Sequence, residues 1–119
     1  MREYRFRGFT LGREHNVWTF GSLVQKEHAT FIKTKEDEVP DIVAPESVGM
    51  KTERYDMLGA PIYEGDVLSN GYHNYVVEWS AEWCAFVLAK DNVSRLMSEQ
   101  DLSCFRVIGN TYKMNGGVQ

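Results

Sequence analysis

Hydrophobic and polar residues alternate over most of this chain, and alternation with a period of two predicts β-strands. In the first part of the chain the pattern predicts strands at residues 4–9, 17–24 and 29–34. In the second of these, Trp18, Phe20 and Val24 fall on one face, and β-branched and aromatic side chains are enriched. Short polar turns separate the segments, so residues 1–34 are expected to form an antiparallel meander.

The second part of the chain is more strongly patterned. Strands are predicted at residues 47–52, 72–79, 83–89 and 105–112, with a further strand beginning at residue 67. Asn70-Gly71 is the strongest hairpin dipeptide, because both residues accept the positive φ of a type I′ turn. The hairpin that follows presents two facing rows of side chains: Tyr75, Val77 and Trp79, and Cys84, Phe86 and Leu88. Such rows predict a hairpin with one face in the core.

Residues 35–46 interrupt this alternation. They are charged, contain Pro40 and Pro45, and show no sustained periodicity. The two prolines exclude a long helix, and we interpret the segment as an exposed connection. Further along, Ser98 suits the N-cap of a helix at residues 98–102, which is too short to exceed one or two turns.

These elements predict a mainly β protein in which antiparallel strands form a small barrel-like or coiled sheet, SH3-like in the C-terminal half. A chain of 119 residues can bury one core. We therefore expect one domain, residues 1–119. The alternative is a division into an N-terminal β meander, residues 1–34, and a C-terminal β barrel, residues 47–112, joined by residues 35–46.

The charge balance narrows the classes of function that are open to this chain. With 13 basic and 17 acidic residues the net charge is −4, which argues against general affinity for nucleic acid. The first segment is basic and the middle acidic, a pattern that would suit head-to-tail subunit contacts but is more often only solvated loops.

The chain begins without an apolar signal region and has no run of about 18 apolar residues, so we expect a cytoplasmic protein with no membrane partner. Cys84 and Cys104 are then expected to be reduced core residues in strands.

One run, residues 59–68, combines two turns with two strand starts. Gly59 and Gly65 accept positive φ, Pro61 restricts the backbone before Ile62, and Glu64-Gly65-Asp66 is a typical turn sequence. The set of residues expected to shape turns is Gly59, Pro61, Glu64, Gly65, Asp66, Gly109 and Asn110.

Several blocks of the chain resemble the YopX family of small phage and prophage proteins. The matching blocks are residues 62–67 (Ile-Tyr-Glu-Gly-Asp-Val), 76–79 (Val-Val-Glu-Trp), 85–87 (Ala-Phe-Val) and 107–110 (Val-Ile-Gly-Asn), followed by Tyr112. The chain departs from the family at Gly8-Phe9-Thr10, where a Trp-Asp pair is common, and at Thr52-Glu53-Arg54, where members tend to have Thr-Gly-Leu. The resemblance implies a mostly β, phage-encoded protein, with a homo-oligomer as one possibility, and no established activity.

Candidate catalytic chemistry is sparse. Glu64, Asp66 and Glu78 are the best candidates for a carboxylate cluster that divides acid and base roles. Turn chemistry explains the first two equally well, because Asp66 can accept backbone N–H groups, and we favour that explanation. The three histidines are scattered and no metal-ligand spacing or phosphate-binding loop occurs, so no metal or cofactor is expected.

Aromatic side chains gather on the hairpin, at Tyr72, Tyr75, Trp79, Trp83 and Phe86. In a small barrel they could stack bases of single-stranded nucleic acid, aided by Lys90 and Arg95. Core or subunit-interface roles are the more common use of such residues, and Glu78 and Glu82 offset the basic charge.

Three functions follow from these observations. The first is a non-catalytic phage or prophage protein that acts through protein contacts, as a homo-oligomer or with an unidentified phage or host protein. The second is a nucleic-acid-binding module with an SH3-like or OB-like barrel, which would use Arg5, Arg7, Trp79 and Trp83. The third, which we favour least, is a hydrolase using Glu64, Asp66 or Glu78.

Overall fold

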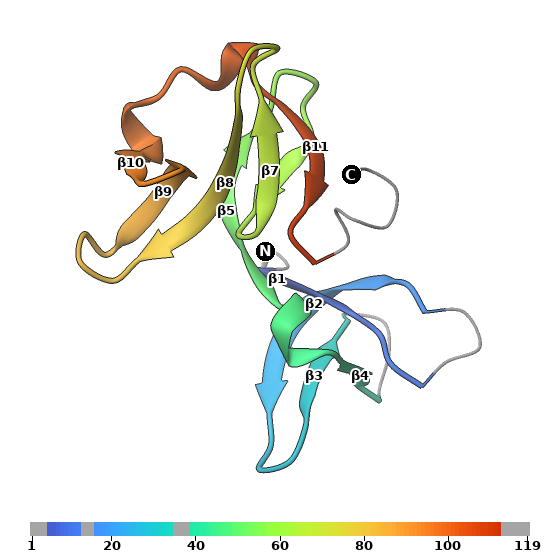
Figure 1. Cartoon of the computed structure of the whole chain (residues 1–119). Coiled ribbons are helices and arrows are strands. Elements are labelled where there is room, and N and C mark those ends of the chain that lie inside the picture. The colour runs from blue at the N-terminus through green and yellow to red at the C-terminus, as the bar shows by residue number, and fades with distance from the viewer. Residues whose placement is uncertain (1–4, 13–15, 35–38, 113–119) are drawn as a thin grey trace. The chain divides into compact units, whose positions relative to one another are not determined.

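The computed structural model describes residues 5–12, 16–34 and 39–112, and within them the chain is built of β-strands with a few short 3₁₀ turns (Figure 1). The strands are β1 (Phe6–Phe9), β2 (Trp18–Gln25), β3 (Thr30–Lys33), β4 (Asp41–Val43), β5 (Gly49–Tyr55), β6 (Pro61–Tyr63), β7 (Asp66–Ser69), β8 (Asn74–Ser80), β9 (Ala85–Lys90), β10 (Val93–Leu96) and β11 (Arg106–Asn110). The 3₁₀ turns are η1 (Pro45–Ser47), η2 (Met97–Glu99) and η3 (Leu102–Cys104).

The strands form two antiparallel sheets. One has the order β4-β3-β2-β1-β5-β6 and the other the order β10-β9-β8-β7-β11. The predicted mainly β, antiparallel fold is confirmed. The sheets are open and not closed into a barrel: within the described residues the end strands β10 and β11 pair only with β9 and β7.

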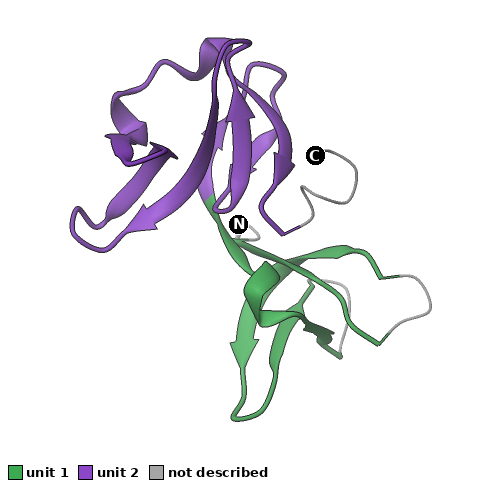
Figure 2. Ribbon diagram, in the orientation of Figure 1, with its two compact units in different colours: residues 1–51 green, residues 52–119 purple. Residues whose placement is uncertain are grey.

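The chain divides into two compact units, residues 1–51 and residues 52–119 (Figure 2). Strand β5 contributes to both. Its Met50 and Gly49 pair with Phe6 and Arg7 of β1 in the first unit, and its later residues belong to the second.

In the first unit the face of β2 that carries Trp18 and Phe20 is the more exposed one. Phe20 is 40% exposed, whereas its neighbours Thr19 and Gly21 are buried. The cause is the close approach of β3: a Cβ on Gly21 would collide with the backbone carbonyl of Lys33. Only glycine fits at this inward-facing position, and the pleat turns its neighbour Phe20 outward.

The predicted exposed connection is wrong in its second half. Residues 41–43 form β4, which pairs with β3, and Val43 and Ala44 are buried. Pro40 stands just before the strand and so removes no hydrogen bond from it. The backbone beyond is fixed by Ser47, whose Oγ accepts the N–H of Phe9 at 2.8 Å and donates to the carbonyl of Ala44 at 2.6 Å. Residues 35–38 lie outside the described residues.

The core of the second unit combines strands and 3₁₀ turns. Its buried members are Ile62, Leu68, Val77, Leu88, Met97, Leu102 and Phe105, with Tyr75, Phe86 and Val107 packed against them. The register aligns Val77 with Leu88 and Trp79 with Phe86, as the two predicted facing rows require. The prediction for these rows is confirmed except at Cys84.

Both cysteines lie outside the core, contrary to expectation. Cys84 occupies the β8–β9 turn with φ of +51°, and Cys104 ends η3. Both thiols are exposed and unpaired with each other. The predicted strand began two residues too early, at residue 83, because the turn before β9 extends through Cys84.

Two further local predictions differ from the structure. The Asn70-Gly71 turn is not type I′, since Gly71 has φ of +93° but Asn70 does not share a positive φ. Instead the Asn70 side chain accepts the N–H groups of Tyr72 and His73 in a longer loop. The helix expected at residues 98–102 is replaced by η2 and η3, and Asp101 caps η3 by accepting the N–H of Ser103.

Candidate functional site

One face of the β8–β9–β10 part of the sheet carries two hollows, one toward each end of β8. Strand register places Tyr75, Val77 and Trp79 on the same face as Phe86, Leu88, Lys90, Val93 and Arg95. Val77 and Leu88 are buried at its centre. The side chains on either side of this pair line two separate hollows of the second unit, one aromatic and one basic.

The aromatic hollow has a volume of about 300 Å³. Its lining residues are Thr52, Arg54, Trp79, Cys84, Ala85, Phe86, Met97 and Ser98. The Trp79 ring meets the Phe86 ring edge-on at 5.1 Å between centroids, yet 48% of Trp79 remains exposed. A half-exposed tryptophan beside a rigid aromatic partner is typical of contact surfaces, where such residues contribute most binding energy.

The polar rim of this hollow is held in place by the backbone. Arg54 donates through Nη1 to the carbonyl of Met97 at 3.0 Å and through Nη2 to that of Gln100 at 3.1 Å. Thr52 donates its hydroxyl to the carbonyl of Ile62 at 2.8 Å. These bonds tie β5 to η2 and to β6, so the hollow has a preformed wall.

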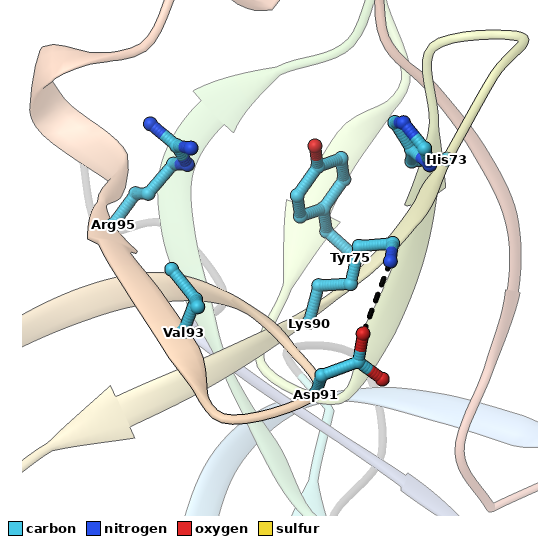
Figure 3. A pocket seen from close by; sticks show the side chains of 6 residues that line it. All are labelled: His73, Tyr75, Lys90, Asp91, Val93 and Arg95. Carbon is cyan, nitrogen blue, oxygen red and sulfur yellow. Dashed lines mark hydrogen bonds and ion pairs between the residues drawn. The ribbon is translucent and has the colours of Figure 1, made fainter.

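The basic hollow, of about 240 Å³, lies at the other end of the same face (Figure 3). It is lined by His73, Tyr75, Lys90, Asp91, Val93 and Arg95. Lys90 Nζ lies 3.2 Å from the Asp91 carboxylate, a pair that forms at an exposed turn. The His73 and Tyr75 rings stand edge to face at 6.5 Å. Sequence patterns indicated Lys90 and Arg95 only as basic residues that could assist base stacking on the hairpin aromatics, and they did not predict this hollow.

The predicted carboxylate cluster does not assemble around Asp66 and Glu78. Asp66 shares the inward face of Leu68 and Val77 and is 1% exposed, whereas Glu78 follows Val77 and points to the opposite face, where it is exposed. Asp66 accepts the N–H of Tyr63 at 2.8 Å, which closes the β6–β7 turn. Glu64 lies in that turn and is half-buried.

Of the residues expected to shape turns, Gly59, Glu64 and Gly65 lie in turns, whereas Pro61 and Asp66 are the first residues of β6 and β7. Gly59 and Gly65 have φ of +84° and +94°, and Pro61 begins β6. Gly109 and Asn110 also lie in a strand, β11, where they pair with Val67 and Asp66. A register shift between Val107 and Gly109 marks a bulge there, which is a common place for glycine in a strand.

Sequence patterns missed the central role of Asp56. Its carboxylate is buried and accepts the N–H groups of Leu58 at 2.9 Å, Ala60 at 2.8 Å and Val107 at 2.9 Å. Burial raises the pKa of this carboxyl, but the three N–H groups and the charge of Arg106 outweigh it and hold the pKa below its usual value. The bonds to Leu58 and Ala60 are local to one turn, whereas the bond to Val107 of β11 joins residues 51 positions apart and has no local sequence signal.

The residues predicted to contact nucleic acid fall in both units. In the first, the Arg7 guanidinium stacks 4.8 Å over the Trp18 ring, and the Arg5 carbonyl accepts the N–H of Lys51. In the second, Trp79 and Trp83 lie at one end of the β8–β9 hairpin, and Trp83 is 50% exposed. The two tryptophans thus share one hairpin end of the second unit, whereas Arg5 and Arg7 belong to the first unit.

Within the residues that the structure describes, no group of three or more His, Cys, Asp or Glu side chains is arranged to hold a metal ion. None of the helical segments in the described ranges has the length and apolar character needed to cross a membrane.

Comparison with curated proteins finds no match. The model of one protein family, described as the YopX protein, matches residues 6–115. This range covers both units and all the blocks in which the sequence resembled that family. The chain therefore belongs to the YopX family.

Proposed function

We propose that this chain is a non-catalytic protein of phage or prophage origin that acts in the host cytoplasm through protein contacts, first of all with a second copy of itself. The aromatic hollow around Trp79 and Phe86 is the contact surface. The single observation that carries the proposal is this preformed hollow, lined by a half-exposed tryptophan and by polar side chains.

The same chain offers a side chain to fill that hollow. Tyr72, at the tip of the β7–β8 hairpin, is 88% exposed, the largest exposure among the large hydrophobic side chains described. It lies at the opposite end of β8 from Trp79, roughly 20 Å away along an extended strand. Tyr72 therefore cannot reach the hollow of its own chain and can fill only that of another copy.

A reciprocal arrangement suits this geometry. In a twofold dimer each chain would insert Tyr72 beside the Trp79–Phe86 pair of its partner, so both hollows and both hairpin tips would be covered. Tyrosine and tryptophan are the residues most enriched at energetically dominant contact positions. The exposed Trp83, next to Cys84 of the hollow's wall, would extend the same surface.

Light scattering on the purified chain over a range of concentrations tests the proposal. We expect a mass of two chains, and we expect Tyr72→Ser to weaken the dimer about tenfold or more, as for other central aromatic contacts. Trp79→Ala should have a similar effect. Leu58→Ser is the matched control, because Leu58 is 71% exposed in the same unit but lines neither hollow.

A chain that stays monomeric at all concentrations would overturn self-association, as would a loss of dimer in Leu58→Ser equal to that in Tyr72→Ser. Nucleic acid co-eluting with a monomer would favour the alternative of a nucleic-acid-binding module. That alternative further requires salt-sensitive binding that weakens when Arg5, Arg7 or Trp83 is replaced.

A further inference from the structure

The basic hollow gathers hydrogen-bond donors in a chain whose net charge is −4. Arg95 comes from β10, Lys90 from β9, Tyr75 from β8 and His73 from the loop before β8. In Figure 3 the Arg95 guanidinium, the Tyr75 hydroxyl and the His73 ring all project toward the same side of the hollow. Four donors from separate segments are thus placed around one space.

Two of these donors have no partner within the described part of the chain: the Arg95 guanidinium and the Tyr75 hydroxyl make no hydrogen bond or ion pair there. The Tyr75 ring is itself fixed, because it packs edge-on against Phe105 at 5.7 Å. Its hydroxyl is therefore held at the hollow by the core and does not swing freely.

Among the four donors, only Lys90 forms an ion pair with a side chain that the structure describes. The Asp91 carboxylate lies 3.2 Å away, but 82% of the Asp91 side chain is exposed. Exposed pairs of this kind are weak, so an anion in the hollow can compete for the ammonium group. Asp91 therefore lowers the affinity of the hollow for an anion but does not prevent binding.

We propose that the basic hollow binds a phosphate group carried on a small molecule. A guanidinium fork, an ammonium and a phenol hydroxyl suit the several oxygens of a phosphate monoester, and charge-assisted hydrogen bonds are the strong ones. The hollow is larger than a phosphate alone needs, which leaves room for part of the group that carries it. This site is at the far end of the face from the aromatic hollow, and all of its lining residues come from one chain.

Titration of the ¹⁵N-labelled full chain with inorganic phosphate, followed by amide chemical shifts at constant ionic strength, tests the site. We expect saturable shifts at His73, Tyr75, Lys90 and Arg95. Arg95→Gln should weaken binding about tenfold, since it removes a charged hydrogen-bond donor. Asp91→Asn should strengthen it, because Lys90 is released. The dispersion of the same spectra reports whether each variant is folded.

Lys26→Gln is the matched control, because it removes one positive charge from an exposed turn in the other unit. It should leave the affinity unchanged. Absence of saturable shifts in the unaltered chain would overturn the proposal, as would equal weakening by Lys26→Gln and Arg95→Gln.

Two further ligands identify the source of the phosphate. A nucleoside monophosphate that binds at least as tightly as inorganic phosphate, and with the same dependence on Arg95, supports a small phosphorylated molecule. Binding only by a single-stranded oligonucleotide, with none by phosphate or the mononucleotide, would overturn it in favour of recognition of a nucleic-acid backbone.

Discussion

At the scale of single residues, Asp56 stabilises the second unit through hydrogen bonds that no sequence motif predicted. Replacing it with Ala leaves the N–H groups of Leu58, Ala60 and Val107 without their acceptor. Buried donors left unsatisfied are costly, so we expect Asp56→Ala to lower the free energy of unfolding by about 3 kcal/mol. Urea denaturation followed by tryptophan fluorescence measures this loss.

Asp101→Ala is the comparison, because Asp101 is exposed and its carboxylate accepts the N–H of one residue, Ser103. Loss of such a cap costs about 1 kcal/mol. Equal losses in the two variants would contradict the special role given to Asp56.

The same carboxylate makes stability depend on pH. The pKa of Asp56 in the folded chain lies below its ordinary value of 3.8, so the folded state favours the ionised form. Its contribution is complete above the unfolded pKa and is lost as the pH falls through the lower, folded pKa. We expect the unaltered chain to lose its stability advantage over Asp56→Asn across this acid range. Asp101, whose pKa is also lowered by Ser103, is present in both proteins and cancels. An advantage that stays constant down to strongly acid pH would refute this expectation.

Glu53 occupies a backbone conformation that glycine prefers. Its φ is +68°, in the left-handed region, within strand β5. The resemblance to the YopX family sets Thr-Gly-Leu against Thr52-Glu53-Arg54, and a glycine at position 53 would adopt this φ without strain. Because a side chain is unfavourable at this φ, Glu53→Gly is expected to stabilise the chain by about 1 kcal/mol.

Thermal or urea unfolding measures this gain. Glu82→Gly, at an exposed turn position whose φ is not positive, is the control and should not stabilise. A loss of stability in Glu53→Gly would show that the side chain's own contacts outweigh the backbone strain.

At the scale of elements, close packing of β2 against β3 decides which face of β2 is buried. Any side chain at Gly21 meets the Lys33 carbonyl, a backbone group that cannot rotate away. Gly21→Ala should therefore cost about 3 kcal/mol or separate the two strands. Circular dichroism during thermal unfolding detects either result. Ser22→Ala, on the exposed face of the same strand, should change stability by less than about 0.5 kcal/mol.

At the scale of the whole molecule, the two exposed thiols can report on the proposed dimer. Cys84 lines the aromatic hollow and Cys104 does not. A bulky maleimide attached to Cys84 in Cys104→Ser should block self-association, because it fills the space proposed for Tyr72. The same reagent attached to Cys104 in Cys84→Ser should leave the dimer intact, as light scattering would show. Equal behaviour of the two labelled proteins would contradict the location of the interface.

The sequence by itself determined the class of fold, the approximate strands and the family. Alternating side chains at residues 72–89 specify a hairpin with Val77 and Leu88 inside, because the pleat is a local property of the backbone. Turn residues such as Gly59 and Gly65 act within a few positions of themselves, and for that reason they can be identified without a structure.

Only the tertiary structure decided which face of β2 is buried, where the two cysteines lie, and which side chains form the hollows. Each of these depends on contacts between segments distant in sequence. Asp56 reaches Val107, Arg54 reaches Met97 and Gln100, and the two hollows form where β8 meets elements that follow or precede it. The periodicity of a sequence describes one segment at a time. Burial and binding surfaces arise where two segments meet, and which segments meet is set by the packing of the whole unit.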